Sequence, residues 1–556
     1  MNRTEYQRET AGALDKRADQ VFVTMRDGVR LATDVYLPDG LQARVPAVLV
    51  RLPYDKSGAF SFMPQIAEYF NAEGFAFVAQ DVRGKFRSEG NTFAFVKEVP
   101  DGYDTLEWLA SQSWSSGEVG MFGDSYYGFT QWAAAMSAHP ALKAIVPRMT
   151  TTEIGTDWMY HQGVFCLATM AEWAASTWID NDTLVPAGLD QLSETLSVTP
   201  LRQVVAAMYD GLDSESFRTW IQHPPFARFW TDDVYAGQPV EWGRIPTLHS
   251  GGFFDVFSRG QLRDFARSLQ GPRPHDQYLI MGATDHFDDQ LTVEGRWPEY
   301  DAADFVKHSF GSYLGPALEF FDVYLRGADR HIPRVRWQHG VAGWRESTSW
   351  PPADARELSL HLGDGSRALQ DAFGGVLAAS PHEHATAVTW LHDPANPVPT
   401  LVTDPWRPLL QLPDDRVAQV RSDVATFTSD AFTTGLDLAG PVRLATQLRA
   451  DAPSAHICAR LTDVSPTGEA RLILEGACLA EAPAAGTAVV VDLGDTGYAV
   501  LPGHSLRLAV SASLYPRYAV STGRADSPFD SVELRSYEQG ITVGGANGAR
   551  LSLTVL

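Results

Sequence analysis

The sequence has only three cysteines and no long hydrophobic run. The cysteines lie far apart in the sequence, at Cys166, Cys458 and Cys478, and do not form a C-x-x-C pair. Their number is odd, whereas a disulfide-rich domain has an even number of closely spaced cysteines. No apolar stretch approaches the roughly 18 residues of a membrane-spanning helix. The polar first twenty residues also lack the apolar core of a secretory signal. We therefore expect a cytoplasmic protein with no membrane partner.

Basic residues are scarce relative to acidic ones. The chain has 44 Lys and Arg against 68 Asp and Glu, a net charge of −24, which argues against nucleic acid and anionic membranes as partners. Its 556 residues suffice for about two to four domains. The sequence leaves the oligomeric state open, a homodimer included.

The hydrophobic pattern changes twice along the chain. Residues 20–145 alternate short apolar strands with helices, which predicts a parallel sheet covered on both faces. The strand pattern stops near residue 146, and residues 158–178 and 201–209 are expected to be helices rich in aromatics and alanine. We interpret this stretch as a helical cap inserted into an α/β domain.

Strand–helix alternation returns after the cap, with expected strands at 245–250 and 277–281. Beyond Trp337, short alternating segments separated by Gly, Pro, Asp and Asn are typical of an all-β sandwich. The predicted regions are the α/β domain in two parts at 1–145 and 241–335, the cap at 146–240 and the sandwich at 336–556.

One short segment predicts covalent chemistry. Gly123-Asp124-Ser125-Tyr126-Tyr127-Gly128 follows an apolar strand and precedes a helical segment. A serine on a tight, glycine-flanked turn between strand and helix is typical of a nucleophile elbow. The helix would direct its N-terminal N–H groups toward the charge that develops during acyl transfer. The alternative is an ordinary strand–turn–helix with an incidental serine.

A serine nucleophile needs a base, and the base needs an orienting carboxylate. In α/β-hydrolases the chain order is Ser, then Asp or Glu, then His. Asp255 follows the strand at 245–250 and His286 follows the strand at 277–281, so Ser125, Asp255 and His286 are the predicted set. Weaker candidates are His161, His249, His275, Asp285 and Asp288.

The oxyanion of such a reaction requires two hydrogen-bond donors. The backbone N–H of Tyr126, directly after the nucleophile, is the first candidate. The phenol of Tyr54, in the loop after the strand at 47–51, is the second. The alternative for Tyr54 is simple packing at the sheet edge.

Five motifs resemble those of the CocE/NonD hydrolases, the family of the bacterial cocaine esterases, related to X-Pro dipeptidyl-peptidases and α-amino-acid ester hydrolases. The resemblance runs from about residue 20 to the C-terminus. The motifs are Arg51-Leu52-Pro53-Tyr54-Asp55-Lys56, Gln80-Asp81-Val82-Arg83-Gly84, Asp101-Gly102-Tyr103-Asp104-Thr105-Leu106-Glu107-Trp108-Leu109, Gly120-Met121-Phe122-Gly123-Asp124-Ser125-Tyr126 and Leu501-Pro502-Gly503-His504.

The resemblance implies an α/β-hydrolase domain, an inserted helical cap and a C-terminal jelly-roll. It implies Ser125 as nucleophile, Asp255 as acid and His286 as base, with Tyr54 and the N–H of Tyr126 in the oxyanion hole. It implies no metal and no organic cofactor. This chain departs from the family pattern just before the histidine, where family members commonly have Gly-Pro-Trp-x-His. Here the sequence is Gly282-Ala283-Thr284-Asp285-His286, so the shell that supports His286 must differ.

The substrate is predicted from the residues after Asp255. Relatives that bind an amino group use carboxylates two and three residues after the catalytic Asp, where this chain has Phe257 and Ser258. A buried ammonium needs a paired carboxylate, so their absence argues against an aminoacyl substrate. Asp157 and Glu172 in the cap remain possible substitutes.

Phe257 suggests an apolar acyl pocket. By resemblance, Trp158 and Trp173 wall this pocket and Phe165 joins them, although cap aromatics can also merely pack the cap onto the sheet. The predicted function is a serine carboxylesterase acting on a small-molecule ester with an apolar or aromatic acyl group. The alternatives are an amidase or acylase, an aminoacyl ester or peptide hydrolase and, outside enzymes, a carbohydrate-binding or scaffold protein.

Overall fold

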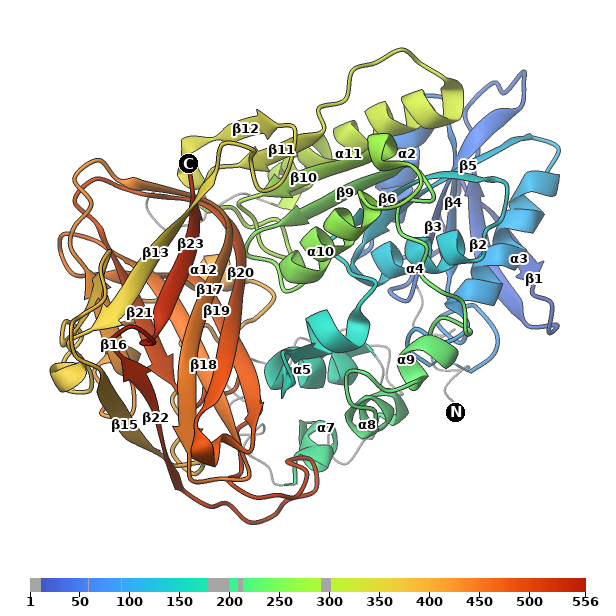
Figure 1. Cartoon of the computed structure of the whole chain (residues 1–556). Coiled ribbons are helices and arrows are strands. Elements are labelled where there is room, and N and C mark those ends of the chain that lie inside the picture. Colours follow the sequence, from blue (N-terminus) through green and yellow to red (C-terminus); the bar gives the residue numbers. More distant parts are fainter. Residues whose placement is uncertain (1–11, 59, 92, 178–199, 209–213, 292–301) are drawn as a thin grey trace.

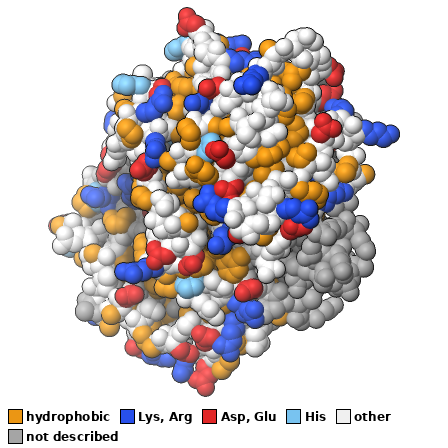
Figure 2. Space-filling model, turned by 90° about the vertical axis from the view of Figure 1, so that its right-hand side faces the viewer, with side chains coloured by type: hydrophobic (Ala, Val, Ile, Leu, Met, Phe, Trp, Pro, Cys, Tyr) orange, Lys and Arg blue, Asp and Glu red, His pale blue; other side chains and the backbone are white. Residues whose placement is uncertain are grey.

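The computed structural model describes residues 12–58, 60–91, 93–177, 200–208, 214–291 and 302–556. It has an α/β part and a β-sandwich side by side, with a group of short helices packed against both (Figure 1). Among the described residues, no helix has the length and apolar character needed to cross a membrane. On the face in Figure 2, acidic and basic side chains are interspersed with hydrophobic ones.

The first sheet has ten strands in the order β1-β2-β4-β3-β5-β6-β9-β10-β11-β12. From β4 to β11 neighbouring strands are parallel, while β1, β2 and β12 pair antiparallel at the edges. The strands are β1 (Asp19–Thr24), β2 (Arg30–Tyr36), β3 (Val45–Leu52), β4 (Ala76–Asp81), β5 (Ser115–Asp124), β6 (Leu142–Arg148), β9 (Thr247–Gly252), β10 (Gln277–Gly282), β11 (Val335–Gln338) and β12 (Trp344–Ser347).

Helices cover this sheet on both faces, so β3 and β4 are almost entirely buried and apolar, as the sequence predicts. On one face, Phe70 of α2 and Phe321 of α11 pack together, and Phe70 also meets Phe122 of β5. On the other, α3 packs against α4. The helices are α2 (Met63–Ala72), α3 (Glu98–Ser111), α4 (Ser125–Met136), α10 (Ser258–Ser268) and α11 (Ala302–Arg326).

The helical cap follows β6 and precedes β9, as expected. It contains a π-helix (Ile154–Met159), a small hairpin of β7 (Tyr160–His161) and β8 (Val164–Phe165), and the helices α5 (Leu167–Thr177), α7 (Val204–Met208), α8 (Glu215–Gln222) and α9 (Phe229–Asp232), with a 3₁₀ turn (Leu201–Gln203) before α7. Residues 178 and 209, the predicted ends of the two cap helices, lie outside the described residues.

The predicted continuous helix at 158–178 is wrong in its first half. Gln162 and Gly163 both have positive φ, 44° and 87°, and form the two-residue turn of the β7–β8 hairpin. Such a turn suits the twist of paired strands and interrupts a helix. Residues 158–159 are the end of the π-helix, and the chain becomes α-helical only from Leu167 onward, as α5.

The C-terminal part is an all-β sandwich whose strands form one 11-stranded sheet that folds over itself. The first sheet extends to Ser347, beyond the boundary predicted at 335/336, because β11 and β12 pair with it. The sandwich strands are β13 (Arg356–Gly363), β14 (Gly375–Ala378), β15 (Thr386–His392), β16 (Ala425–Ser429), β17 (Leu436–Ala450), β18 (Ser454–Val464), β19 (Ala470–Glu481), β20 (Thr487–Val500), β21 (Ser505–Ser511), β22 (Tyr537–Val543) and β23 (Arg550–Val555).

Candidate active site

Ser125 lies at the sharp turn between β5 and α4. Its φ of 53° is in the left-handed region, which an ordinary side chain rarely adopts and which a tight turn imposes here. Two glycines allow the turn. Gly123 has φ 138°, and a Cβ at Gly128 would lie 2.7 Å from the Thr150 methyl group. Ser125 as a residue is partly exposed.

The glycine requirement yields a first prediction. A Cβ at Gly123 would collide with the ring of Tyr127. Gly123→Ala should therefore lower the free energy of unfolding by roughly 2–4 kcal/mol in denaturant titrations. Gly117→Ala is the matched control, because Gly117 also has a positive φ of 84° but nothing within 4 Å of the added Cβ. The control should lose only about 1 kcal/mol, and equal losses would contradict a steric role for the elbow glycine.

Buried contacts hold Tyr126, the residue after Ser125. Its hydroxyl donates to Glu98 at 2.8 Å and accepts the backbone N–H of Phe95 at 2.9 Å. Glu98 in turn pairs with buried Arg51 at 2.8 Å. The Tyr126 side chain thereby anchors the first turn of α4, which orients the backbone N–H groups at the start of that helix.

Tyr54 lies in the loop after β3 and connects the sheet with the cap. Its hydroxyl accepts a hydrogen bond from Nε1 of Trp173 in α5 at 3.2 Å and shares a hydrogen bond with Ser125. Burial raises the pKa of Tyr54 to about 12, so the phenol keeps its proton at neutral pH. The structure thus places a protonated hydroxyl beside the Ser125 side chain.

Asp255 and His286 meet above neighbouring strands of the sheet. Asp255 follows β9 and His286 follows β10, and Nδ1 of the imidazole lies 2.6 Å from Oδ2 of the buried carboxylate. The other oxygen, Oδ1, accepts the backbone N–H of Phe257 at 2.8 Å. With Nδ1 engaged by the carboxylate, Nε2 is the ring nitrogen available for proton transfer.

The sandwich supplies a neighbour of His286 that sequence reasoning missed. The ring of Trp406 lies 4.9 Å from the imidazole, and its carbonyl accepts the backbone N–H of His286 at 3.2 Å. Trp406 therefore occupies part of the shell left open by the absence of the usual proline and tryptophan before His286. Trp406 is far from His286 in sequence, and no spacing rule connects the two.

Three of the four predicted pocket aromatics lie together near His286. Trp158 stacks on Phe257 with centroids 4.9 Å apart, and Phe257 lies 5.7 Å from the His286 ring. Trp173 meets Trp158 edge-to-face at 4.9 Å. Phe165 instead packs against other rings, those of Tyr160, Phe217 and Phe529.

The two cap carboxylates differ in their surroundings. Asp157 forms an ion pair with Arg263, and burial raises its pKa to about 6. Glu172 accepts Nε1 of Trp406 at 3.1 Å. Burial, and then the nearby charge of Asp404, raises the pKa of Glu172 to about 8. In the described part of the chain, no group of His, Cys, Asp and Glu side chains has the arrangement of a metal site.

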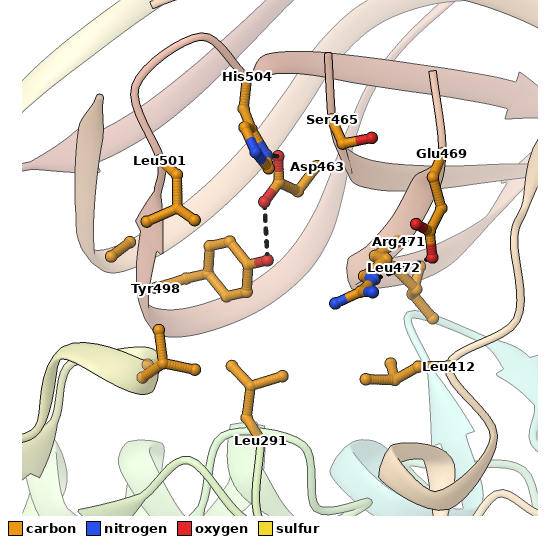
Figure 3. Close-up of a pocket in the computed structure, with 13 residues that line it drawn as sticks. Leu291, Leu412, Asp463, Ser465, Glu469, Arg471, Leu472, Tyr498, Leu501 and His504 are labelled. Atoms are coloured by element: carbon orange, nitrogen blue, oxygen red, sulfur yellow. Dashed lines mark hydrogen bonds and ion pairs between the residues drawn. The ribbon is translucent and has the colours of Figure 1, made fainter. Parts of the chain in front are cut away.

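A cavity of about 220 Å³ lies elsewhere, between the α/β part and the sandwich (Figure 3). Leu291 and Leu412 lie on one side of it and a polar group on the other, in which Asp463 accepts from Tyr498 at 2.9 Å and bonds His504 at 2.8 Å. His504 ends the Leu-Pro-Gly-His motif. None of the predicted site residues lines this cavity.

Comparisons with known proteins agree with the two-part architecture. Residues 27–288 match the family model described as X-Pro dipeptidyl-peptidase (S15 family), and residues 327–549 match the X-Pro dipeptidyl-peptidase C-terminal non-catalytic domain. The cocaine esterase of Rhodococcus sp. (strain MB1 Bresler) is 31% identical over 550 residues, covering 90% of this chain and 91% of that protein.

Solved structures are similar over nearly the whole chain. An α-amino acid ester hydrolase superposes with a TM-score of 0.78 at 25% identity, covering 98% of both chains. A CocE/NonD family hydrolase from Staphylococcus aureus superposes with a TM-score of 0.67 at 16% identity, covering 97% of this chain and 93% of the other, a likeness of fold alone.

Proposed function

Because this chain belongs to the CocE/NonD family of serine hydrolases, we propose that it is a carboxylesterase that uses Ser125, His286 and Asp255. The observation that carries the proposal is the 2.6 Å contact between His286 and Asp255 at the carboxyl ends of adjacent strands. Ser125 lies at the turn between β5 and α4, at the same edge of this sheet. This is the arrangement that general-base activation of a serine requires.

In the proposed reaction, Ser125 Oγ attacks the ester carbonyl while Nε2 of His286 accepts its proton. Asp255 holds the imidazole through Nδ1 and stabilises its charged form. The oxyanion receives the phenol of Tyr54 and the backbone N–H of Tyr126. His286 then protonates the leaving alcohol, and the acyl-enzyme is hydrolysed when the same imidazole activates a water molecule.

The acyl group is proposed to lie against Trp158, Trp173 and Phe257. These rings form a buried aromatic wall that begins beside His286. Such a wall favours flat or apolar acyl groups through buried area and ring stacking, worth a few kcal/mol in total. Phe165 is left out of this pocket because its ring packs elsewhere.

A substrate panel tests this proposal. Chromogenic esters from acetyl to benzoyl should be cleaved with kcat/KM rising toward the bulky neutral acyl groups, because larger groups bury more apolar surface. Matched anilides should react much more slowly, because the aniline nitrogen is a poorer leaving group than the oxygen of the ester. Faster cleavage of anilides than of esters would replace the esterase proposal with an amidase.

Glu172 favours a second candidate function, the hydrolysis of aminoacyl esters. Its carboxyl is mostly buried near Asp404 and accepts a hydrogen bond from the Trp406 indole, so a substrate ammonium could pair with it. An α-amino ester in the same panel distinguishes the two functions. If the amino ester reacts fastest and Glu172→Gln abolishes that advantage, the second candidate replaces the first.

The remaining expectations stay predictions of the sequence. They are a cytoplasmic location, a small-molecule ester as the partner, no nucleic-acid or membrane partner, no cofactor and an oligomeric state that includes the homodimer as an option.

A further inference from the structure

Three aspartates surround His286 in sequence, and none of them contacts its ring nitrogens. All three, Asp285, Asp288 and Asp289, lie in the histidine loop, which we define as residues 285–289, and two of them pair with different arginines. Asp288 pairs with Arg148, whereas Asp289 pairs with Arg407. The loop therefore has one attachment to the α/β part and one to the segment before the sandwich strand β16.

The first attachment joins the histidine loop to the nucleophile. Arg148, at the end of β6, pairs with Asp288 and also with Asp124 at 2.9 Å. Asp124 is the residue directly before Ser125. Asp288 has a φ of 65°, so this side of the loop is held in a left-handed conformation.

The second attachment is a two-point ion pair. Arg407 Nε lies 2.7 Å from Asp289 Oδ2, and Nη2 lies 2.9 Å from Oδ1. Asp289 is fully buried, while the Arg407 side chain is partly exposed. A fork of two parallel hydrogen bonds fixes orientation as well as distance, which a lysine ammonium cannot reproduce.

Two hydrogen bonds near this ion pair also connect residues 406–409 to the histidine loop. Asp285 Oδ2 lies 3.3 Å from the Leu409 N–H, and the Trp406 carbonyl accepts the His286 N–H at 3.2 Å. Burial, and then the nearby charge of Asp289, raises the pKa of Asp285 to about 9. Residues 406–409 thus contact the loop at His286 itself and at the residues on either side of it.

We propose that Arg407 is a positioning residue for His286, holding the histidine loop through Asp289 so that the imidazole keeps its place between Asp255 and Ser125. The proposal rests on the proposed function, because it assigns Arg407 to the same base. Arg407 lies in the region that matches the C-terminal non-catalytic domain. Through Arg407, this region helps to position the catalytic base. Arg407 contacts no reacting atom.

Arg407→Lys is the main test because it keeps the charge and removes the fork. A misplaced base slows the chemical step, so kcat for ester hydrolysis should fall on the order of 10- to 100-fold with little change in KM. Covalent labelling of Ser125 by a fluorophosphonate should slow by a similar factor. Arg421→Lys is the matched control, because Arg421 makes the same two-point pair with Asp423, at 2.8 Å for both contacts, away from the site.

Chemical rescue separates positioning from a general loss of folding. Arg407→Ala should recover part of its labelling rate when guanidinium chloride is added at low millimolar concentration, and sodium chloride at equal ionic strength should have no effect. Asp289→Asn should lower kcat as well, and the double variant Asp289→Asn with Arg407→Lys should lose no more than the worse single variant, because the two residues act as one unit.

The outcomes distinguish this proposal from the proposed function. If wild-type protein hydrolyses esters and Arg407→Lys labels at the wild-type rate, Arg407 has no positioning role. A lowered rate without guanidinium rescue, together with additive losses in the double variant, would also overturn it. If the wild-type protein neither hydrolyses esters nor labels at Ser125, the proposed function itself fails.

Discussion

Ser125→Ala should remove fluorophosphonate labelling and lower kcat for ester hydrolysis on the order of 10⁴-fold or more. This is the largest effect that we expect from any single substitution. Alanine retains the small size that the elbow accepts at φ 53° and removes only the hydroxyl that attacks the carbonyl. Loss of the nucleophile forbids the acyl-enzyme, so the residual rate comes from substrate binding and the oxyanion donors.

Ser137→Ala is the control for this experiment. Ser137 directly follows the same helix α4, and its hydroxyl donates to the Ala134 carbonyl at 2.6 Å. This variant should label and turn over as the wild type does. Mass spectrometry of the labelled peptide gives the position of the adduct, and an adduct that persists in Ser125→Ala would refute Ser125 as the nucleophile.

Tyr54→Phe should lower kcat on the order of 10²- to 10³-fold, because one of the two proposed oxyanion donors is lost. The ring that packs edge-to-face against Tyr127 at 6.1 Å is kept, so KM should change little. Since the pKa of Tyr54 is raised to about 12, its hydroxyl stays protonated throughout the neutral range. The ratio of wild-type to variant kcat should therefore be constant from about pH 6 to pH 9.

Tyr127→Phe provides the matched control for Tyr54. Tyr127 is a neighbouring tyrosine with a pKa also raised by burial, but it has no proposed contact with the oxyanion. A kcat close to that of the wild type is expected. If the two variants lose activity equally, or if the Tyr54→Phe loss appears in KM alone, Tyr54 binds substrate and does not stabilise the transition state.

Most of the α/β part could be predicted because its signals are local. Strands β3 and β4 are short apolar runs, and the elbow has its glycines within five residues of each other. Asp255 and His286 could be chosen because the carboxyl ends of adjacent parallel strands meet at one edge of a sheet. Where a two-residue turn interrupted an apparently helical stretch, at Gln162 and Gly163, the aromatic content was misleading.

The surroundings of the site could not be predicted in the same way. Phe165 is an aromatic residue of the cap, like the two tryptophans proposed to line the pocket. Its ring nevertheless packs away from His286, against Phe217 and Phe529. Trp406 and Arg407 lie more than a hundred residues beyond His286, and their contacts exist only because the sandwich packs against the histidine loop. Contacts between distant segments follow from packing, which no periodicity in the chain records.

By itself, the sequence determined the order of elements, the elbow at Ser125 and the strand-end positions of Asp255 and His286, because these depend on local geometry and on the topology of a parallel sheet. The tertiary structure alone decided which aromatic rings lie beside His286, that Asp157 pairs with Arg263 while Glu172 meets an indole, and that Arg407 holds the histidine loop. The physical reason is that burial and pairing of a side chain are set by the segments packed around it. Those segments come from three distant regions of the chain.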